Sequence, residues 1–181
     1  MKFKSHKQYR LPTRTYAEDG CYFVTVCTRD REHFFGKIEH KAMNYSELGL
    51  ILKNEIENLE SQWQDVHINA FVVMPNHFHL LLTIGNTLLF PKNNKTLWIN
   101  QEQARFGLQP LIPNSVSSII NHLKGRVTKL CRKIHADFSW QSRFHDHIVR
   151  DMDSYNKIYY YYYILNNPEN WGNDIFSKNE L

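Results

Sequence analysis

The sequence predicts an α+β domain of the ferredoxin-like class, with an antiparallel sheet and helices packed on one face. Three segments rich in β-branched and aromatic residues (21–28, 66–74 and 77–84) are typical of strands. Two further segments repeat apolar residues every three or four positions, which is typical of amphipathic helices. The predicted order is β-α-β-β-α-β plus a C-terminal helix, and 181 residues fit a single domain spanning 1–181.

The first strand, CYFVTVCT, is followed by residues 33–44, which predict a short hairpin with Gly36 near its turn. A helix should come next, capped by Asn44 and Glu47. Its apolar positions are spaced 4, 4, 3 and 4: Leu48, Leu52, Ile56, Leu59 and Trp63.

Residues 66–74 and 77–84 are separated only by Pro75-Asn76, a tight-turn pair, so we expect an antiparallel hairpin. A second helix is predicted from about Ser115. Its apolar stripe is Val116, Ile119, Ile120, Leu123, Val127, Leu130 and Ile134. A strand at 143–150 and a last helix from Asp153 complete the pattern, and this helix should end before Asn167-Pro168 because the residue preceding proline disfavours helical geometry.

Two segments carry no regular period. Residues 85–114 predict a long loop, and residues 1–16 form an arm with five basic residues and no acidic one. The formal net charge is only +4, but residues 115–150 are locally basic. This region predicts nucleic-acid contacts through Lys124, Arg126, Lys129, Arg132 and Arg143. On charge alone, a solvated charged face explains it equally well.

The three cysteines show no CxxC spacing, and their odd number argues against a disulfide scaffold. We therefore expect a reducing, cytoplasmic setting. The basic N-terminus lacks the apolar segment of a signal peptide. No apolar run approaches the roughly 18 residues that a membrane-spanning helix needs, so no membrane partner is expected.

The most informative segment is VMPNHFHLLL, residues 73–82, which carries two histidines one residue apart. In a strand such residues project from the same face, with Cα atoms about 6.5–7 Å apart. His77 and His79 can therefore direct ring nitrogens at one divalent ion, Mg²⁺ or Mn²⁺, able to polarise a scissile phosphate. The alternative is structural: one histidine hydrogen-bonded and the other exposed.

A second pair of the same kind is His145-Asp146-His147. His147 could supply a third metal ligand or a general base, although the flanking Arg143 and Arg150 also suit a polar edge strand. Two such pairs keep a zinc-dependent hydrolase open as an alternative function. Against it, no HExxH or cysteine-rich zinc pattern occurs.

Several segments together resemble one known family. FVVMPNHFHLLL resembles the HUH signature of the IS200-like transposases, which include the REP-associated tyrosine transposases. YFVTVCTRDREHFFG, SIINHLKGRVTKL and WQSRFHDHIVRDMDSYNKIYYYYYILNNPENW resemble their counterparts in that family, in the same order, over roughly residues 8–172. The loop 85–114 is poorly matched.

The resemblance implies an HUH endonuclease fold that binds single-stranded or hairpin DNA. It also implies metal-dependent strand cleavage and joining through a covalent 5′-phosphotyrosine, the chemistry of DNA transposition by mobile elements. His77 and His79 match the two metal-binding histidines. Members are often homodimers.

The resemblance places the catalytic tyrosine just after an LKG-like segment, where this chain has Arg126. The nucleophile is instead predicted within the run Tyr159–Tyr163, at Tyr160 or Tyr163, with Thr128 or metal-bound water as alternatives. A second interpretation is a domesticated DNA-binding module that has lost catalysis.

Overall fold

The computed structural model describes residues 19–85, 112–162 and 167–177. Most of the N-terminal arm and of the loop 85–114 lies outside these ranges, as does Tyr163. Four strands form one antiparallel sheet in the order β4-β5-β1-β6. This is the predicted ferredoxin-like sheet, and its strands are β1 (Gly20–Cys27), β4 (Val66–Met74), β5 (His77–Ile84) and β6 (His145–Val149).

The bounds of β4 and β5 agree with the sequence prediction, and the turn between them is Pro75-Asn76. The small hairpin is also present, as β2 (Gly36–Glu39) and β3 (Ala42–Tyr45). Its turn, however, is at His40 and Lys41, which both have positive φ, while Gly36 begins β2. The hairpin therefore turns at two non-glycine residues in the left-handed region.

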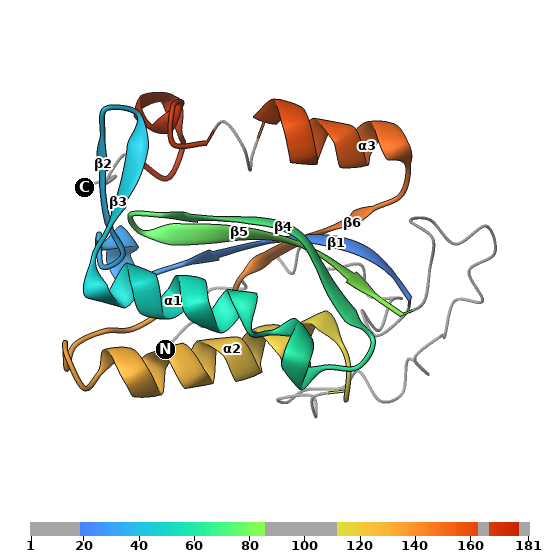
Figure 1. Cartoon of the computed structure of the whole chain (residues 1–181), viewed down its shortest axis with the longest axis horizontal. Coiled ribbons are helices and arrows are strands. Elements are labelled where there is room, and N and C mark those ends of the chain that lie inside the picture. Colours follow the sequence, from blue (N-terminus) through green and yellow to red (C-terminus); the bar gives the residue numbers. More distant parts are fainter. Residues whose placement is uncertain (1–18, 86–111, 163–166, 178–181) are drawn as a thin grey trace, which may run out of the picture.

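Helices α1 (Glu47–Glu57) and α2 (Val116–Cys131) lie side by side on one face of the sheet (Figure 1). The helix α2 begins next to Ser115, as expected, and Ser115 is its cap. The cap of α1 is Ser46, whose hydroxyl accepts from the amide of Gly49, so the predicted cap at Asn44 is wrong because Asn44 lies in β3. The helix α1 also ends before Leu59 and Trp63.

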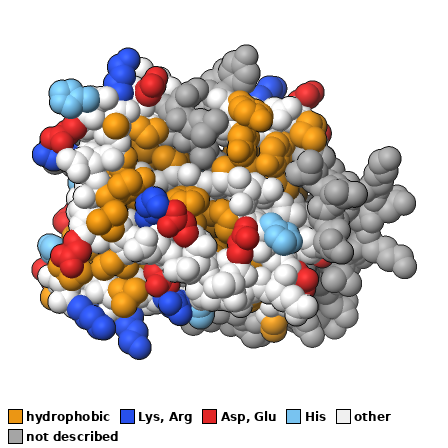
Figure 2. Space-filling model, viewed as in Figure 1, with side chains coloured by type: hydrophobic (Ala, Val, Ile, Leu, Met, Phe, Trp, Pro, Cys, Tyr) orange, Lys and Arg blue, Asp and Glu red, His pale blue; other side chains and the backbone are white. Residues whose placement is uncertain are grey.

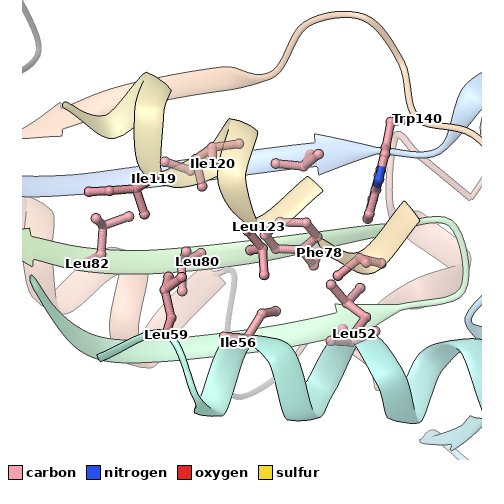
Figure 3. Packing of buried hydrophobic residues seen from close by; sticks show 14 of the residues in the cluster. Leu52, Ile56, Leu59, Phe78, Leu80, Leu82, Ile119, Ile120, Leu123 and Trp140 are labelled. Atoms are coloured by element: carbon pink, nitrogen blue, oxygen red, sulfur yellow. The ribbon is translucent and has the colours of Figure 1, made fainter. Parts of the chain in front are cut away.

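The main core lies between these two helices and the sheet (Figure 3). Alternate residues of β5 supply Phe78, Leu80 and Leu82, all with no exposed surface. They meet apolar residues of both helices, among them Leu52, Ile56, Ile119 and Leu123. Leu130 and Ile134, which were predicted in the stripe of α2, are only half-buried and exposed, respectively.

The opposite face of the sheet is covered by the C-terminal helix α3 (Met152–Asn156), which continues as a π-helical turn, Lys157–Tyr162 (Figure 1). Ile158 packs there against a smaller buried cluster that includes Leu81, Met74 and Val149. The two helices of the β-α-β-β-α-β unit thus share one face, and the added helix takes the other. Within the described residues no helix is both long and apolar enough to cross a bilayer.

Candidate metal centre

The two histidines of β5 point to the face of the sheet that carries α3. Their strand partners are Met74 and Cys27 for His77, and Val72 and Thr25 for His79. Phe78, between them, points into the main core. Both imidazoles are almost fully buried, at 0% and 1% exposure, so neither is the exposed histidine of the structural alternative.

The Nε2 atoms of His77 and His79 face each other across 3.2 Å. Asp174, close to the C-terminus, places Oδ2 3.8 Å from Nε2 of His77. One potential ligand atom from each of these three residues lies within 4.8 Å of the others. Two ligands held about 2.1 Å from one ion at roughly 90–100° would be about 3.0–3.2 Å apart, which is the separation of the two imidazole nitrogens.

The Nδ1 atom of each histidine is also engaged. Nδ1 of His77 lies 2.8 Å from Oδ1 of Asn76, and Nδ1 of His79 lies 2.8 Å from the hydroxyl of Thr25. Histidines that bind metals usually have such a partner on the nitrogen away from the ion, because it orients the ring. The partners of the two Nδ1 atoms therefore orient both rings so that their Nε2 atoms point toward each other.

Burial sets the protonation of this cluster. It lowers the pKa of His79 to about 3. Burial also lowers the pKa of His77 well below its usual value, with further contributions from the charges of His79 and Arg31. Both rings are therefore neutral at pH 7, which is the form that binds metals. The pKa of Asp174 is raised, mainly by burial.

These observations fit a divalent cation. Two neutral imidazoles and a carboxylate converge, and a positive ion between them would offset the desolvation of Asp174. The residues His77, His79 and Asp174 could therefore hold the metal that the sequence predicts.

The segment that carries Asp174 also covers the histidines. The ring of Phe176 lies 4.7 Å from that of His77, and Trp171 stacks on the same imidazole at 6.0 Å between centroids. The guanidinium of Arg31 lies over the Phe176 ring at 5.5 Å. This segment is not predicted from the sequence, because nothing in residues 171–176 signals that the chain returns to β5.

The predicted third ligand, His147, lies on β6 opposite Phe23, and His145 lies opposite Thr25. Both are on the same sheet face as the β5 histidines but are exposed. In the described part of the chain, the group within mutual reach contains Asp174 and not His147. The structure thus brings a carboxylate from the C-terminal segment to the place that the sequence suggested for His147.

The described tyrosines of the C-terminal run divide between core and surface. Tyr155 and Tyr159 pack against the smaller cluster, and their rings stack at 5.8 Å. Tyr160 is 56% exposed and meets Tyr159 edge-on. This helix lies on the sheet face that carries His77 and His79.

Position 126, where the resemblance places the nucleophile, lies on the other face. Arg126 is on α2, and its guanidinium donates to the carboxylate of Glu55 on α1 at 2.5 and 3.2 Å. Thr128, on the same helix, donates its hydroxyl to the carbonyl of Lys124. The sheet separates α2 from the histidine pair, so within one chain neither position 126 nor Thr128 reaches that pair.

The basic residues predicted to contact DNA have varied roles. Lys124 is partly buried and donates to the carbonyl of Gln141 at 2.7 Å, and burial lowers its pKa. Arg132 donates to the carbonyl of Phe138, whereas Lys129 and Arg143 are exposed. On the face shown in Figure 2, basic side chains are interspersed with acidic ones and form no continuous patch.

No family model matches the chain. An uncharacterized protein of Haemophilus influenzae is 34% identical to it over 169 residues, which is 93% of this chain and 91% of that protein. The chain belongs to the family of that protein.

Among solved structures, the REP-associated tyrosine transposase bound to a REP hairpin aligns with 85% of this chain and 67% of its own length. The TM-score is 0.50 and the sequence identity 20%. At that identity the likeness shows the fold alone, and this is the fold of a member of the family that the sequence resembles.

Proposed function

We propose that this protein is a transposase-like HUH protein that binds single-stranded or hairpin DNA and cleaves and rejoins strands in a metal-dependent reaction. One observation carries the proposal: the Nε2 atoms of His77 and His79 lie 3.2 Å apart beside Asp174, in a transposase fold. Two buried neutral imidazoles beside a carboxylate match the ligand set of a divalent cation.

A DNA partner is supported by the neighbouring structure, since that transposase was solved with a REP hairpin. On this chain, the exposed basic residues at the end of α2 suit phosphate contacts. The amide of Arg29 donates to the carbonyl of Ser139, and Phe34 packs on His135, so this end of α2 joins the loop beside Asn76. Exposed Lys129 and Lys133 would contact phosphates of a DNA strand that continues past the sheet edge onto the helix-covered face.

The roles of the chain's own residues follow from their positions. His77, His79 and Asp174 would hold the ion, Mn²⁺ or Mg²⁺, which when bound polarises the scissile phosphate. A tyrosine hydroxyl, from Tyr160 or from Tyr163 outside the described residues, would attack the phosphorus and lose its proton. The bond between phosphorus and O3′ would break, giving a 5′-phosphotyrosine, and the leaving O3′ would take up a proton to become a free 3′-hydroxyl. Attack by a second 3′-hydroxyl would then reform a DNA strand and release the tyrosine.

Two alternatives keep specific support. Trp171 and Phe176 of the C-terminal segment cover the ring of His77, and such a cover would keep a DNA phosphate away from this histidine. A module that binds DNA without cleaving it is therefore the second function to test. A set of two histidines and one carboxylate is also a common zinc set, which supports a zinc-dependent hydrolase as the third. Arg126, which occupies the position where the resemblance places the tyrosine, is the sequence feature that supports the DNA-binding module.

The decisive experiment uses labelled stem-loop oligonucleotides with randomised loops and single-stranded flanks, incubated with the protein and Mn²⁺. We expect a covalent protein–DNA adduct that survives denaturing electrophoresis. It should disappear in His77→Ala and in Tyr160→Phe or Tyr163→Phe, but persist in the matched control Tyr159→Phe, whose ring packs in the smaller cluster. Binding without an adduct would support the DNA-binding module, and absence of binding at moderate salt would overturn both DNA functions.

A further inference from the structure

Asn76 occupies the turn between β4 and β5 and has no exposed surface. Its backbone carbonyl accepts from the amide and the hydroxyl of Thr28, at 2.9 and 3.0 Å. Its side chain makes three further hydrogen bonds, to Arg31, Phe176 and His77. A buried residue that is bonded this fully has one orientation available to its side chain.

The chemistry of these partners fixes which end of the Asn76 amide is which. Nδ2 lies 3.1 Å from the backbone carbonyl of Arg31 and 2.9 Å from that of Phe176. Carbonyl oxygens only accept hydrogen bonds, so the group facing them must be the NH₂. Reversing the amide would place its oxygen against two other oxygens in a buried site. Oδ1 therefore faces His77.

This orientation also fixes the proton on His77. Oδ1 can only accept, so Nδ1 of His77, 2.8 Å away, must carry the hydrogen and donate it. In a neutral imidazole the other nitrogen then has a lone pair. That nitrogen is Nε2, which points at His79 and Asp174. The tautomer enforced by Asn76 is the one that a metal ligand needs.

His79 is held differently. Its Nδ1 partner is the hydroxyl of Thr25, which can either donate or accept. Without an ion, Nε2–H of His79 can donate to Nε2 of His77 across 3.2 Å. With an ion, the proton must lie on Nδ1 instead, where the hydroxyl of Thr25 can accept it. The pair thus has one fixed member and one that adapts.

We propose that Asn76 is a positioning residue that holds His77 in its Nδ1–H tautomer and so prepares the pair for a divalent cation, while Thr25 lets His79 change tautomer when the cation binds. The ion-binding part rests on the proposed function. The tautomer part does not, because it concerns the metal-free protein.

The test compares Asn76→Ala with Asn76→Asp. Both remove the NH₂ that reaches Arg31 and Phe176, but only aspartate keeps an oxygen facing His77. The second oxygen of aspartate faces those two carbonyls, so circular dichroism first checks that each variant is folded. Two-bond ¹H–¹⁵N correlation spectra of the metal-free protein, with labelled histidines, report the tautomer of each ring. Calorimetry with Mn²⁺ alone reports affinity. Loss of an outer partner of a ligating histidine typically weakens metal binding by about 10- to 100-fold.

We expect His77 as Nδ1–H in the wild type and in Asn76→Asp, and a mixture of tautomers in Asn76→Ala. Mn²⁺ affinity should fall about 10- to 100-fold in Asn76→Ala and be at least that of the wild type in Asn76→Asp. Thr25→Val should leave the tautomer of His77 unchanged while weakening Mn²⁺ binding.

Three results would overturn the proposal: wild-type His77 in the Nε2–H form, unchanged affinity in Asn76→Ala, or equal losses in the alanine and aspartate variants. The first needs no variant, so it stays decisive if Asn76→Ala fails to fold. If the wild type binds no Mn²⁺, the metal-dependent function fails, whereas the spectra still decide whether Asn76 fixes the tautomer.

Discussion

Strand β5 presents two different surfaces on alternate residues. Phe78, Leu80 and Leu82 enter the core beneath α1 and α2, while His77 and His79 lie under the C-terminal segment on the other face. Both sets are buried, yet the first is purely apolar and the second brings ring nitrogens into contact. Burial alone therefore does not separate stabilising residues from functional ones. The hydrogen bonds of each side chain do.

The largest expected effect on stability is on the helix-covered face. Phe78 is fully buried and meets the indole of Trp140 edge-on at 5.9 Å. Phe78→Ala would remove a large ring from a packed core, and we expect a loss of about 3–5 kcal/mol in the free energy of unfolding. Urea unfolding followed by circular dichroism measures it. A loss below about 1 kcal/mol would mean that this face is not the main core.

On the histidine face, a substitution should change metal binding strongly and stability only a little. In His79→Leu the volume is roughly kept and the hydroxyl of Thr25 loses one partner, so we expect a stability change of no more than about 2 kcal/mol. Mn²⁺ binding, measured by calorimetry, should nevertheless fall below detection because one of two imidazole ligands is gone. A destabilisation as large as that of Phe78→Ala would instead identify His79 as a core residue.

Features that depend on local sequence patterns could be predicted, whereas features that depend on contacts between distant segments could not. The bounds of β4 and β5 follow from an apolar and β-branched run interrupted by Pro75-Asn76, and the start of α2 from Ser115 before an apolar stripe. These are local patterns. Ser46 was missed because Asn44 offered a similar local signal, and only the pairing of β2 with β3 excludes it.

The site was harder to predict because part of it is not local. His77 and His79 were found because their spacing places them on one strand face. Asp174 lies nearly a hundred positions later in a segment without periodicity, and only the folded chain brings it to His77. The same limit applies to Arg126, whose pairing with Glu55 depends on how α2 lies against α1.

Arg126 offers a smaller and more specific test. Arg126→Ala leaves the buried carboxylate of Glu55 without its guanidinium, so the unfolding midpoint should fall, though less than in Phe78→Ala. DNA cleavage should be unchanged, because this side chain lies across the sheet from the histidines.

Lys129→Ala is the matched comparison for that variant. Lys129 is an exposed base on the same helix, and its replacement should weaken DNA binding and reduce the salt dependence of binding. If Arg126→Ala reduced that salt dependence instead, Arg126 would contact phosphate as the sequence suggested, and its pairing with Glu55 would break on DNA binding.

The smallest perturbation comes from labelling the cysteines, which lie on both faces. Cys131 is in the main core and Cys21 in the smaller cluster under α3, and all three thiols are buried and free. Burial raises the pKa of Cys21 to about 11 and that of Cys131 to about 12. Both thiols therefore stay protonated at pH 8, and they react with a disulfide reagent only after local or global unfolding exposes them. The helix α3 is short, and short elements that cover small clusters open locally.

In single-cysteine variants we therefore expect Cys21 to react faster than Cys131, with a weak dependence on denaturant, and Cys131 to react at the rate set by global unfolding. Equal rates with the same denaturant dependence would contradict this and show that both faces open together. Faster labelling of Cys21 would mean that the covering of the histidine face can part while the core beneath α1 and α2 stays folded, which is how a buried metal centre could admit a DNA phosphate.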